Sequence, residues 1–219
     1  MKNKIVDVVF KKFQSFSFII FLALILGAFF VLSQLNNSKK DDVEPVGTQT
    51  TVTTEQNNQD TNLVEDEVFK LPLDAENPEI ARNFYDAEAT LDEQLSSIIQ
   101  VDNIFFINNG VNYTVDKETD FNVLVTLTGT VTKVRQDALV GYLVEVEHLY
   151  GIKSVYHSLA TVNVAVGDQV EQGDLLGKAG ANNYDQDSGI HVHFEVLLGN
   201  INLNPNELIG TKISEFDNE

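Results

Sequence analysis

Hydrophobic residues form one long run near the N-terminus and then recur in short runs through the rest of the chain. No charged side chain occurs from Phe13 to Ser38, and a helix of ~20 residues within this stretch is long enough to span a bilayer. The pattern predicts a transmembrane helix over residues 13–35. A cleaved signal peptide is the alternative, but no Ala-x-Ala-like site follows Leu32. Four lysines precede the run, so we expect a cytoplasmic tail over residues 1–12 and the remainder of the chain across the membrane.

The next segment, residues 36–67, is rich in Asn, Asp, Thr, Gln and Glu and has almost no large apolar side chain. Such a composition buries too little surface to offset the loss of chain entropy on folding. We therefore expect a disordered acidic stalk that holds the folded domain away from the membrane. A spacer without a function of its own is the alternative.

From residue 68 onward the pattern is typical of short strands separated by glycine-containing turns. Thr90-Leu-Asp-Glu93 has the spacing of a capping box and predicts a short helix. The expected strands, rich in β-branched and aromatic residues, are 123–127, 130–134, 142–148, 162–166 and 191–196. The prediction is a mainly β, antiparallel domain over residues 68–212, followed by a tail over 213–219.

The segment from Gly167 to Gly180 carries glycines at regular turn positions and predicts a hairpin. Lipoyl and biotinyl carrier domains share this pattern. A carrier needs a modifiable lysine at an exposed hairpin tip, whereas Lys178 follows the motif and lies next to glycine. The carrier interpretation is therefore disfavoured.

Charge and cysteine content narrow the classes of function. The 219 residues include 33 Asp and Glu, 14 Lys and Arg and no Cys, for a net charge of −19. Six lysines and one aspartate fall within the first 40 residues, so the remainder carries a net charge of −24. A nucleic-acid binder is unexpected at this charge, and thiolate metal sites and disulfides are excluded.

Histidine is the remaining candidate for metal chemistry. His191 and His193 lie two residues apart in an expected strand, where side chains at this spacing face the same way and converge on one spot. A zinc site needs at least three protein ligands, and only His148 and His157 remain as imidazole donors. Taken alone, such a pair is more often a polar surface or hydrogen-bonded pair than a metal site.

The order and spacing of several motifs over about residues 100–207 resemble the LytM/lysostaphin-like M23 zinc endopeptidase domain. The motifs are Gly129-Thr-Val-Thr-Lys-Val134, Val144-Glu-Val-Glu-His148, Tyr156-His-Ser-Leu159, Val164-Ala-Val-Gly-Asp-Gln-Val-Glu-Gln-Gly173, Gly177-Lys-Ala-Gly180, His191-Val-His-Phe-Glu195 and Asn204-Pro205. The resemblance implies the LytM/M23 fold, an antiparallel β domain of the barrel-sandwich-hybrid type.

The resemblance also assigns roles to residues. Active members hold zinc with the His and Asp of a His-x-Gly-x-Asp segment and with the second His of His-x-His. Here Asn108 and Asn112 stand at the first two positions, and His193 matches the third. His191 matches the general base, and Ser158 stands where the second catalytic histidine is expected. One remaining ligand does not hold a catalytic zinc, so the resemblance implies a pseudo-enzyme without zinc and without catalytic residues.

Two further histidines and two aspartates complete the candidates. His157 lies one place before the family histidine, which on a regular strand turns its side chain to the opposite face, and His148 matches a structural histidine. The competing hypothesis is a peptidoglycan endopeptidase that recruits Asp185, Asp187 or His157 to the metal. We expect the two aspartates to be turn residues instead. A third hypothesis is a module that binds the cell wall without cutting it.

The segments Ala81-Arg-Asn-Phe-Tyr-Asp86 and Asn109-Gly-Val-Asn-Tyr113, with the expected anchor and stalk, resemble a group of sporulation proteins of endospore-forming Firmicutes. This resemblance implies a forespore membrane protein that binds stage III sporulation protein AH across the intermembrane space. The pair is expected to form an engulfment zipper and channel complex, as a ring oligomer. An exposed edge strand is the expected docking surface, and the acidic domain predicts a basic partner.

Overall fold

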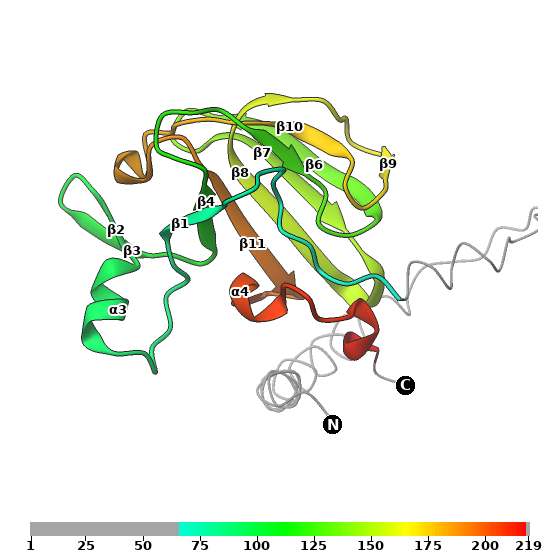
Figure 1. Cartoon of the computed structure of the whole chain (residues 1–219), viewed down its shortest axis with the longest axis horizontal. Coiled ribbons are helices and arrows are strands. Elements are labelled where there is room, and N and C mark those ends of the chain that lie inside the picture. The colour runs from blue at the N-terminus through cyan, green and yellow to red at the C-terminus, as the bar shows by residue number, and fades with distance from the viewer. Residues whose placement is uncertain (1–65, 218–219) are drawn as a thin grey trace, which may run out of the picture. The chain divides into compact units, whose positions relative to one another are not determined.

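The computed structural model describes residues 66–217 (Figure 1). The strands are β1 (Glu79–Arg82), β2 (Ile98–Val101), β3 (Ile104–Ile107), β4 (Val111–Thr114), β5 (Asn122–Leu124), β6 (Gly129–Asp137), β7 (Gly141–Glu147), β8 (Ile152–Val162), β9 (Gln169–Val170), β10 (Leu175–Ala179), β11 (Val192–Leu198) and β12 (Ile201–Leu203). The helices are α3 (Leu91–Ser96), α4 (Pro205–Leu208) and the 3-10 turns η1 (Leu149–Gly151), η2 (Gln186–Ser188) and η3 (Ile213–Phe216). The predicted mainly β, antiparallel fold is confirmed.

Ten of the strands form one antiparallel sheet with the order β1-β4-β11-β8-β7-β6-β9, while β12 pairs with β11 and β10 pairs with β5 and β8. The long strand β8 lies at the centre because it pairs with β7, β10 and β11. Its neighbour β11 shows strict alternation: Val192, Phe194, Val196 and Leu198 are buried, and the residues between them are half-buried. This alternation turns the odd-numbered side chains of β11 to the other face of the sheet.

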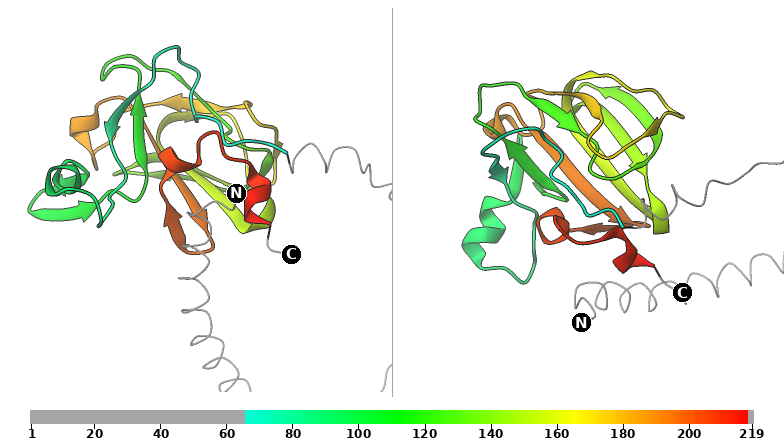
Figure 2. Two further views of the ribbon diagram at one scale, coloured as in Figure 1. Left: turned by 60° about the horizontal axis from the view of Figure 1, so that its bottom comes forward. Right: turned by 45° about the vertical axis from the view of Figure 1, so that its right-hand side comes forward.

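A separate two-stranded sheet, β2 paired with β3, projects from the main sheet together with α3 (Figures 1 and 2). The predicted capping box is confirmed: the Thr90 hydroxyl accepts from the Glu93 amide, and the Glu93 carboxylate accepts from the Thr90 amide. Sequence patterns did not indicate β2 or β3, because apolar residues occupy both faces of these short strands instead of alternating with polar ones.

Three sequence-based expectations are wrong. The segment from Gly167 to Gly180 is not a hairpin, since β9 pairs with β6 and β10 pairs with β5 and β8. The strand expected over 162–166 ends at Val162, the last residue of β8. The C-terminal tail expected from residue 213 begins with core residues, because Ile213 and Phe216 are buried and the Phe216 ring packs edge-on against Phe69 at 6.0 Å.

The expected cytoplasmic tail, transmembrane helix and nearly all of the stalk lie outside the described residues. Within residues 66–217, no helix is long and apolar enough to cross a membrane.

Candidate functional site

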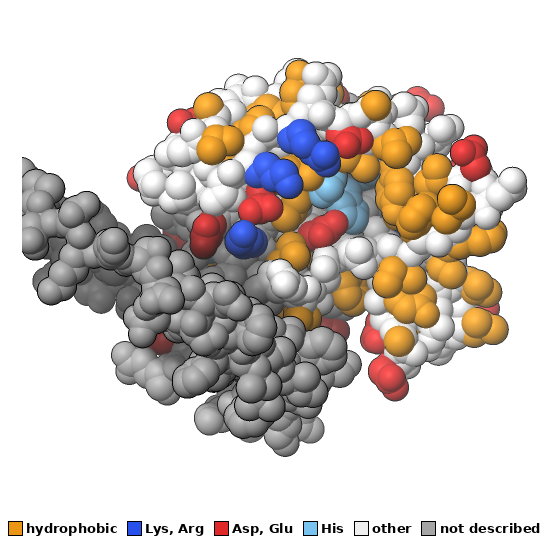
Figure 3. Space-filling view, turned by 180° about the vertical axis from the view of Figure 1, so that it is seen from behind, with side chains coloured by type: hydrophobic (Ala, Val, Ile, Leu, Met, Phe, Trp, Pro, Cys, Tyr) orange, Lys and Arg blue, Asp and Glu red, His pale blue; other side chains and the backbone are white. Residues whose placement is uncertain are grey.

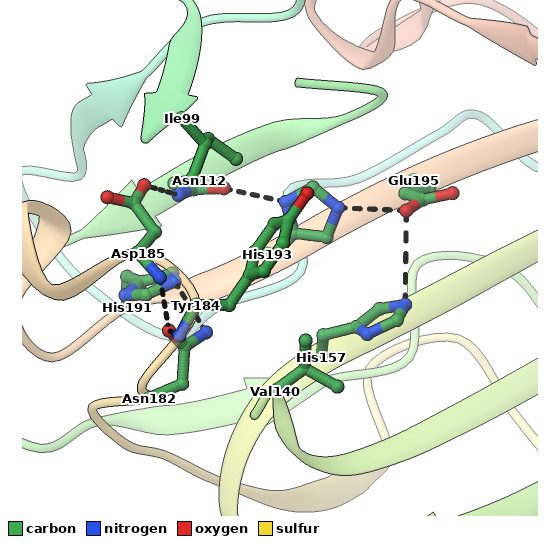
Figure 4. Close-up of a pocket in the computed structure, with 10 residues that line it drawn as sticks. All are labelled: Ile99, Asn112, Val140, His157, Asn182, Tyr184, Asp185, His191, His193 and Glu195. Carbon is green, nitrogen blue, oxygen red and sulfur yellow. Dashed lines mark hydrogen bonds and ion pairs between the residues drawn. The ribbon is translucent and has the colours of Figure 1, made fainter. Parts of the chain in front are cut away.

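The candidate site is a small pocket of about 160 Å³ on the face of the sheet where β11, β8 and β4 meet (Figure 4). Its lining residues are Ile99, Asn112, Val140, His157, Asn182, Tyr184, Asp185, His191, His193 and Glu195. The predicted convergence of His191 and His193 is therefore confirmed. Glu195 joins them because it lies two residues further along the same strand face.

Strand register brings the remaining groups together. His193 of β11 lies opposite Asn112 of β4 on one side and opposite His157 of β8 on the other. Asn112 in turn lies opposite Arg82, at a β-bulge in β1 that breaks the regular register. Four strands thus place their side chains in one row across the sheet.

The position of the first family ligand is occupied by an amide that is already engaged. Asn108 is buried, and its Nδ2 donates to the carbonyl oxygens of Asn83 at 2.9 Å and Gly110 at 2.8 Å. These two acceptors determine the orientation of the carboxamide. A neutral carboxamide held in this way does not replace an imidazole ligand.

The position of the second ligand is engaged as well. Asn112 Nδ2 donates to Asp185 Oδ2 at 2.8 Å and to the Ser188 hydroxyl at 3.1 Å. Because the amino group must face the carboxylate, Asn112 Oδ1 faces His193 Nδ1 at 2.7 Å and accepts a hydrogen bond from it.

His193, the remaining family ligand, has an acceptor at each ring nitrogen. Its Nδ1 donates to Asn112 Oδ1, and its Nε2 lies 2.9 Å from the carboxylate oxygen Glu195 Oε1. Both ring nitrogens are therefore occupied by protein groups. Burial raises the pKa of Glu195, but the hydrogen bond and charge of His193 outweigh it and hold that pKa below its ordinary value.

A second ion pair lies at the other end of the row. Arg82 Nε and Nη2 donate to the two carboxylate oxygens of Asp185 at 2.6 and 2.8 Å, a bidentate pair with side-chain exposures of 11% and 3%. Burial alone would raise the pKa of Asp185; hydrogen bonds from Arg82 and Ser188 lower it below its ordinary value. Asp185 lies in the loop at the start of the η2 turn, as expected of a turn residue, and in addition pairs with Arg82, whereas Asp187 of the same turn is 94% exposed.

The expected role of His157 also needs correction. A single step along a regular strand would turn His157 and Ser158 to opposite faces, but Ser158 has a φ of 61° and breaks the alternation. Both side chains reach the site: the Ser158 hydroxyl lies 2.9 Å from His191 Nε2, and the His157 ring centroid lies 5.3 Å from that of His193. Burial, followed by the adjacent His193, lowers the pKa of His157 to about 4.

His191 is fully buried, with both ring nitrogens engaged. Its Nδ1 donates to the Gly189 carbonyl at 2.8 Å, which leaves Nε2 to accept from the Ser158 hydroxyl. Asn182 Nδ2 donates to that same hydroxyl oxygen. Burial lowers the pKa of His191 to about 4, so the ring is neutral. Both nitrogens of this buried imidazole are thus occupied by protein groups.

His148 lies away from the pocket, in agreement with its expected structural role. It is 7% exposed, with Nδ1 3.0 Å from the Thr128 carbonyl and Nε2 2.8 Å from the Ser154 hydroxyl. Burial lowers its pKa to about 4.

These donors do not fit a zinc ion. Two ligand positions present amides held by other partners, and at the third both ring nitrogens of His193 are engaged by Asn112 and Glu195. Arg82 already supplies a cation to Asp185, so the charge of that carboxylate is balanced without a metal. In the part of the chain that the structure describes, no three His, Asp or Glu side chains are arranged to hold a metal ion.

Sequence reasoning missed Arg82, Asp185 as a network member, Asn182 and Glu195. Glu195 was recoverable from its period-two spacing to His193. Arg82 lies in the segment Ala81–Asp86, which carried part of the sporulation resemblance, but its contact with Asp185 joins residues 103 positions apart. No local pattern encodes such a contact.

Comparisons with known proteins place the chain among M23-like proteins. Residues 106–205 match the peptidase family M23. Stage II sporulation protein Q of Bacillus subtilis (strain 168) is 36% identical over 145 residues, which cover 66% of this chain and 51% of that protein. The matched segment thus spans about half the length of this curated relative.

Comparison with solved structures supports the same relationship. The structure of the SpoIIQ–SpoIIIAH pore-forming complex contains a chain that is 36% identical, with a TM-score of 0.66 over 68% of this chain and 94% of that one. A zinc-containing peptidase from Vibrio cholerae is 25% identical, with a TM-score of 0.51 over 64% of this chain and 40% of that one. Residues 106–205 therefore form a peptidase family M23 domain, in a chain that resembles stage II sporulation protein Q.

Proposed function

We propose that this chain is a non-catalytic M23-like sporulation protein that binds stage III sporulation protein AH. In this proposal it lies in the forespore membrane, with its N-terminus in the cytoplasm and its M23 domain in the intermembrane space. The two proteins hold the membranes together as an engulfment zipper and contribute to a channel complex, arranged as a ring. The SpoIIQ–SpoIIIAH pore-forming complex supports the choice of partner.

The proposed loss of catalysis rests on one observation: at the three positions where the family holds zinc, the side chains are already hydrogen-bonded to other protein groups. Asn108 and Asn112 donate to other groups, and His193 lies between Asn112 and Glu195. Without a metal there is no Lewis acid and no water of lowered pKa to attack a peptide bond. Chemistry by the family mechanism is therefore not expected.

The wall-binding alternative has less support. The pocket of about 160 Å³ is smaller than the ~300–1,000 Å³ typical of sites that enclose a ligand. Its polar groups are also directed at one another. A peptide would therefore have little space and few free donors there.

The test uses the purified full chain in lipid nanodiscs, with a zinc-binding M23 peptidase treated in parallel. After incubation with zinc and dialysis, we expect the chain to retain far less than one equivalent of zinc and to release no fragments from peptidoglycan. Stoichiometric zinc with cleavage would overturn the assignment as a pseudo-enzyme.

Partner binding is tested separately by two pull-down assays. One uses stage III sporulation protein AH and the other uses isolated sacculi. Because the part of the chain after residue 40 is acidic, we expect binding to the protein to weaken between ~50 and ~500 mM salt. Retention on sacculi alone would favour a wall binder. Binding that is unchanged by salt would count against a basic partner face.

A further inference from the structure

The strongest unassigned feature is the segment at which the described chain enters the domain, residues 66–74, called the strap here. On one side it is hydrogen-bonded to residues 210–213, and the pairing is antiparallel because Val68 lies opposite Lys212. Three backbone bonds of 2.9 Å join the two segments: Phe69 N to the Thr211 carbonyl, Gly210 N to the Phe69 carbonyl and Ile213 N to the Glu67 carbonyl. The strap thus has a paired edge on this side.

The other edge of the strap is paired with residues 122–126, where Leu73 lies opposite Val123 in an antiparallel bridge. The backbone bonds are Lys70 N to the Thr126 carbonyl at 3.4 Å, Leu124 N to the Pro72 carbonyl at 3.0 Å and Asp74 N to the Asn122 carbonyl at 3.3 Å. The strap is therefore held like an inner strand of a sheet. Both sets of bonds must break before it leaves the domain.

Side chains reinforce these backbone bonds. The Glu67 carboxylate accepts from the Thr128 amide at 2.8 Å and from the Thr128 hydroxyl. Gln172 Nε2 donates to the carbonyls of Val68 and Thr126, both at 2.7 Å, so one carboxamide ties the strap to its neighbour. The Phe69 ring is 1% exposed. The strap is therefore anchored by its side chains as well as by its backbone.

The strap is separate from the vestigial site and from the matched family segment. Figure 3 shows the histidines on one face of the molecule, where they line the pocket. The partners of the strap lie elsewhere, at residues 122–128, 172 and 210–213. The family match covers residues 106–205, so both the strap and residues 210–213 lie outside it. The M23 match therefore does not account for this pairing.

The direction of the strap determines how a pull on the chain would act. In Figure 1 the strap, in cyan, runs from the right-hand side, where the described chain begins, toward β1. Leu139 lies near that far end, because its carbonyl accepts from the amides of Asn183 and Tyr184, next to the Asp185 that binds Arg82 of β1. A pull on the chain before Asp66 against a point at Leu139 therefore acts along the strap.

Hydrogen bonds of an antiparallel pair are perpendicular to the strands, so a pull along the strap loads them together. A pull against residue 217 acts differently. Because the strap and residues 210–213 are antiparallel, the chain before Asp66 and residue 217 leave the pair at the same end. The bonds between them would then break one after another, at a lower force.

We propose that the strap bears tension: it transmits a pull on the preceding part of the chain to the sheet and keeps the domain closed under load. This inference rests on the proposed function, because tension arises when the chain is anchored in one membrane and held at the other. It adds the element that carries the load.

The experiment measures opening forces with optical tweezers on the full chain in nanodiscs. The chain has no Cys, so introduced cysteines take the handles: Asn58→Cys before the strap, with either Leu139→Cys or Asp217→Cys as the second point. Leu139 is 49% exposed and Asp217 is exposed, so both accept a handle. We expect the first opening to need at least ~2-fold more force with Leu139→Cys than with Asp217→Cys.

Gln172→Ala tests the side-chain contact, and Gln169→Ala is its matched control. Gln169 is exposed, and its Nε2 donates to the Thr130 hydroxyl at 2.9 Å, away from the strap. With the Leu139 attachment, Gln172→Ala should lower the opening force and speed hydrogen exchange of the Lys70 amide at least ~5-fold, whereas Gln169→Ala should change exchange less than ~2-fold.

Equal opening forces at the two attachment points overturn the strap as the load-bearing element and leave the proposed function intact. Opening and exchange of Gln172→Ala that match the wild type do the same. The comparison of attachment points uses the wild-type strap, so it decides the question even where Gln172→Ala does not fold. The force measurement contains no partner. Failure to bind stage III sporulation protein AH in the pull-down therefore overturns the proposed function separately.

Discussion

His193 has both of its ring nitrogens engaged by protein groups. A zinc ligand must be a neutral imidazole with a free lone pair. Here Asn112 supplies a carbonyl oxygen to Nδ1 and Glu195 a carboxylate oxygen to Nε2. Asn112 is itself held in place, since its Nδ2 is committed to Asp185.

We predict that the Nδ1 of His193 carries a proton that is hydrogen-bonded to Asn112 Oδ1. Long-range ¹H–¹⁵N correlation spectra of the histidine rings show which ring nitrogens carry a proton. Replacing Asn112 by Ala removes the acceptor, so the Nδ1 proton signal of His193 should weaken in Asn112→Ala while the spectrum of His148 stays unchanged. An unprotonated Nδ1 in the wild type would contradict the assignment of the hydrogen-bond donor.

At the scale of elements, the pairing of β4 with β11 places Asn112 opposite His193, and this pairing depends on Gly110. A Cβ at position 110 would lie 2.3 Å from the Phe194 carbonyl oxygen and 2.9 Å from Glu195 Cγ. Glycine is required here by close approach of the neighbouring strand. Glycine between Asn108 and Asn112 thus has a packing reason that is independent of metal binding.

Gly110→Ala is therefore expected to lower the free energy of unfolding by ~1–3 kcal/mol, because the two strands must separate to admit the methyl group. Asn109→Ala is the matched control, since residue 109 is exposed and its change should stay within ~0.5 kcal/mol. Urea denaturation followed by circular dichroism measures both. Equal stability of the two variants would show that β4 and β11 have more space than the structure indicates.

At the scale of the whole molecule, three histidines with lowered pKa values link stability to pH. Burial lowers the pKa values of His148, His157 and His191 to about 4. In the unfolded chain these imidazoles take up protons below pH ~6.5, whereas in the folded protein they stay neutral down to about pH 4. Their contribution to stability is therefore complete above pH ~6.5, and it declines as the pH falls from ~6.5 toward 4.

Each of these groups is expected to contribute a slope of up to ~1.4 kcal/mol per pH unit in that window. Urea midpoints at pH 7.5, 6 and 5 provide the measurement. His148→Gln should reduce the slope by about a third, because it removes one of the three titrating groups without altering the pocket. A midpoint independent of pH between 7.5 and 5 would mean that these rings are accessible to protons in the folded state.

The sequence by itself determined the fold class, the short capped helix, the M23 resemblance and the replacement of both ligands of the first motif by amides. These features are local: they depend on periodicity, on turn residues and on the order of motifs along one chain. The strands β2 and β3 were not predicted because their apolar residues do not alternate with polar ones. The orientation of His157 was predicted wrongly because the positive φ of Ser158 leaves no signature in the sequence.

Only the tertiary structure decided what occupies the vestigial site. Arg82 reaches Asp185 across 103 positions, and Asn112 reaches His193 across 81. Contacts between residues so far apart follow from strand register and bulges, which are set by the packing of the whole sheet. The residue types at the ligand positions are thus readable along the chain, whereas the hydrogen-bonded row of side chains in the site exists only after folding.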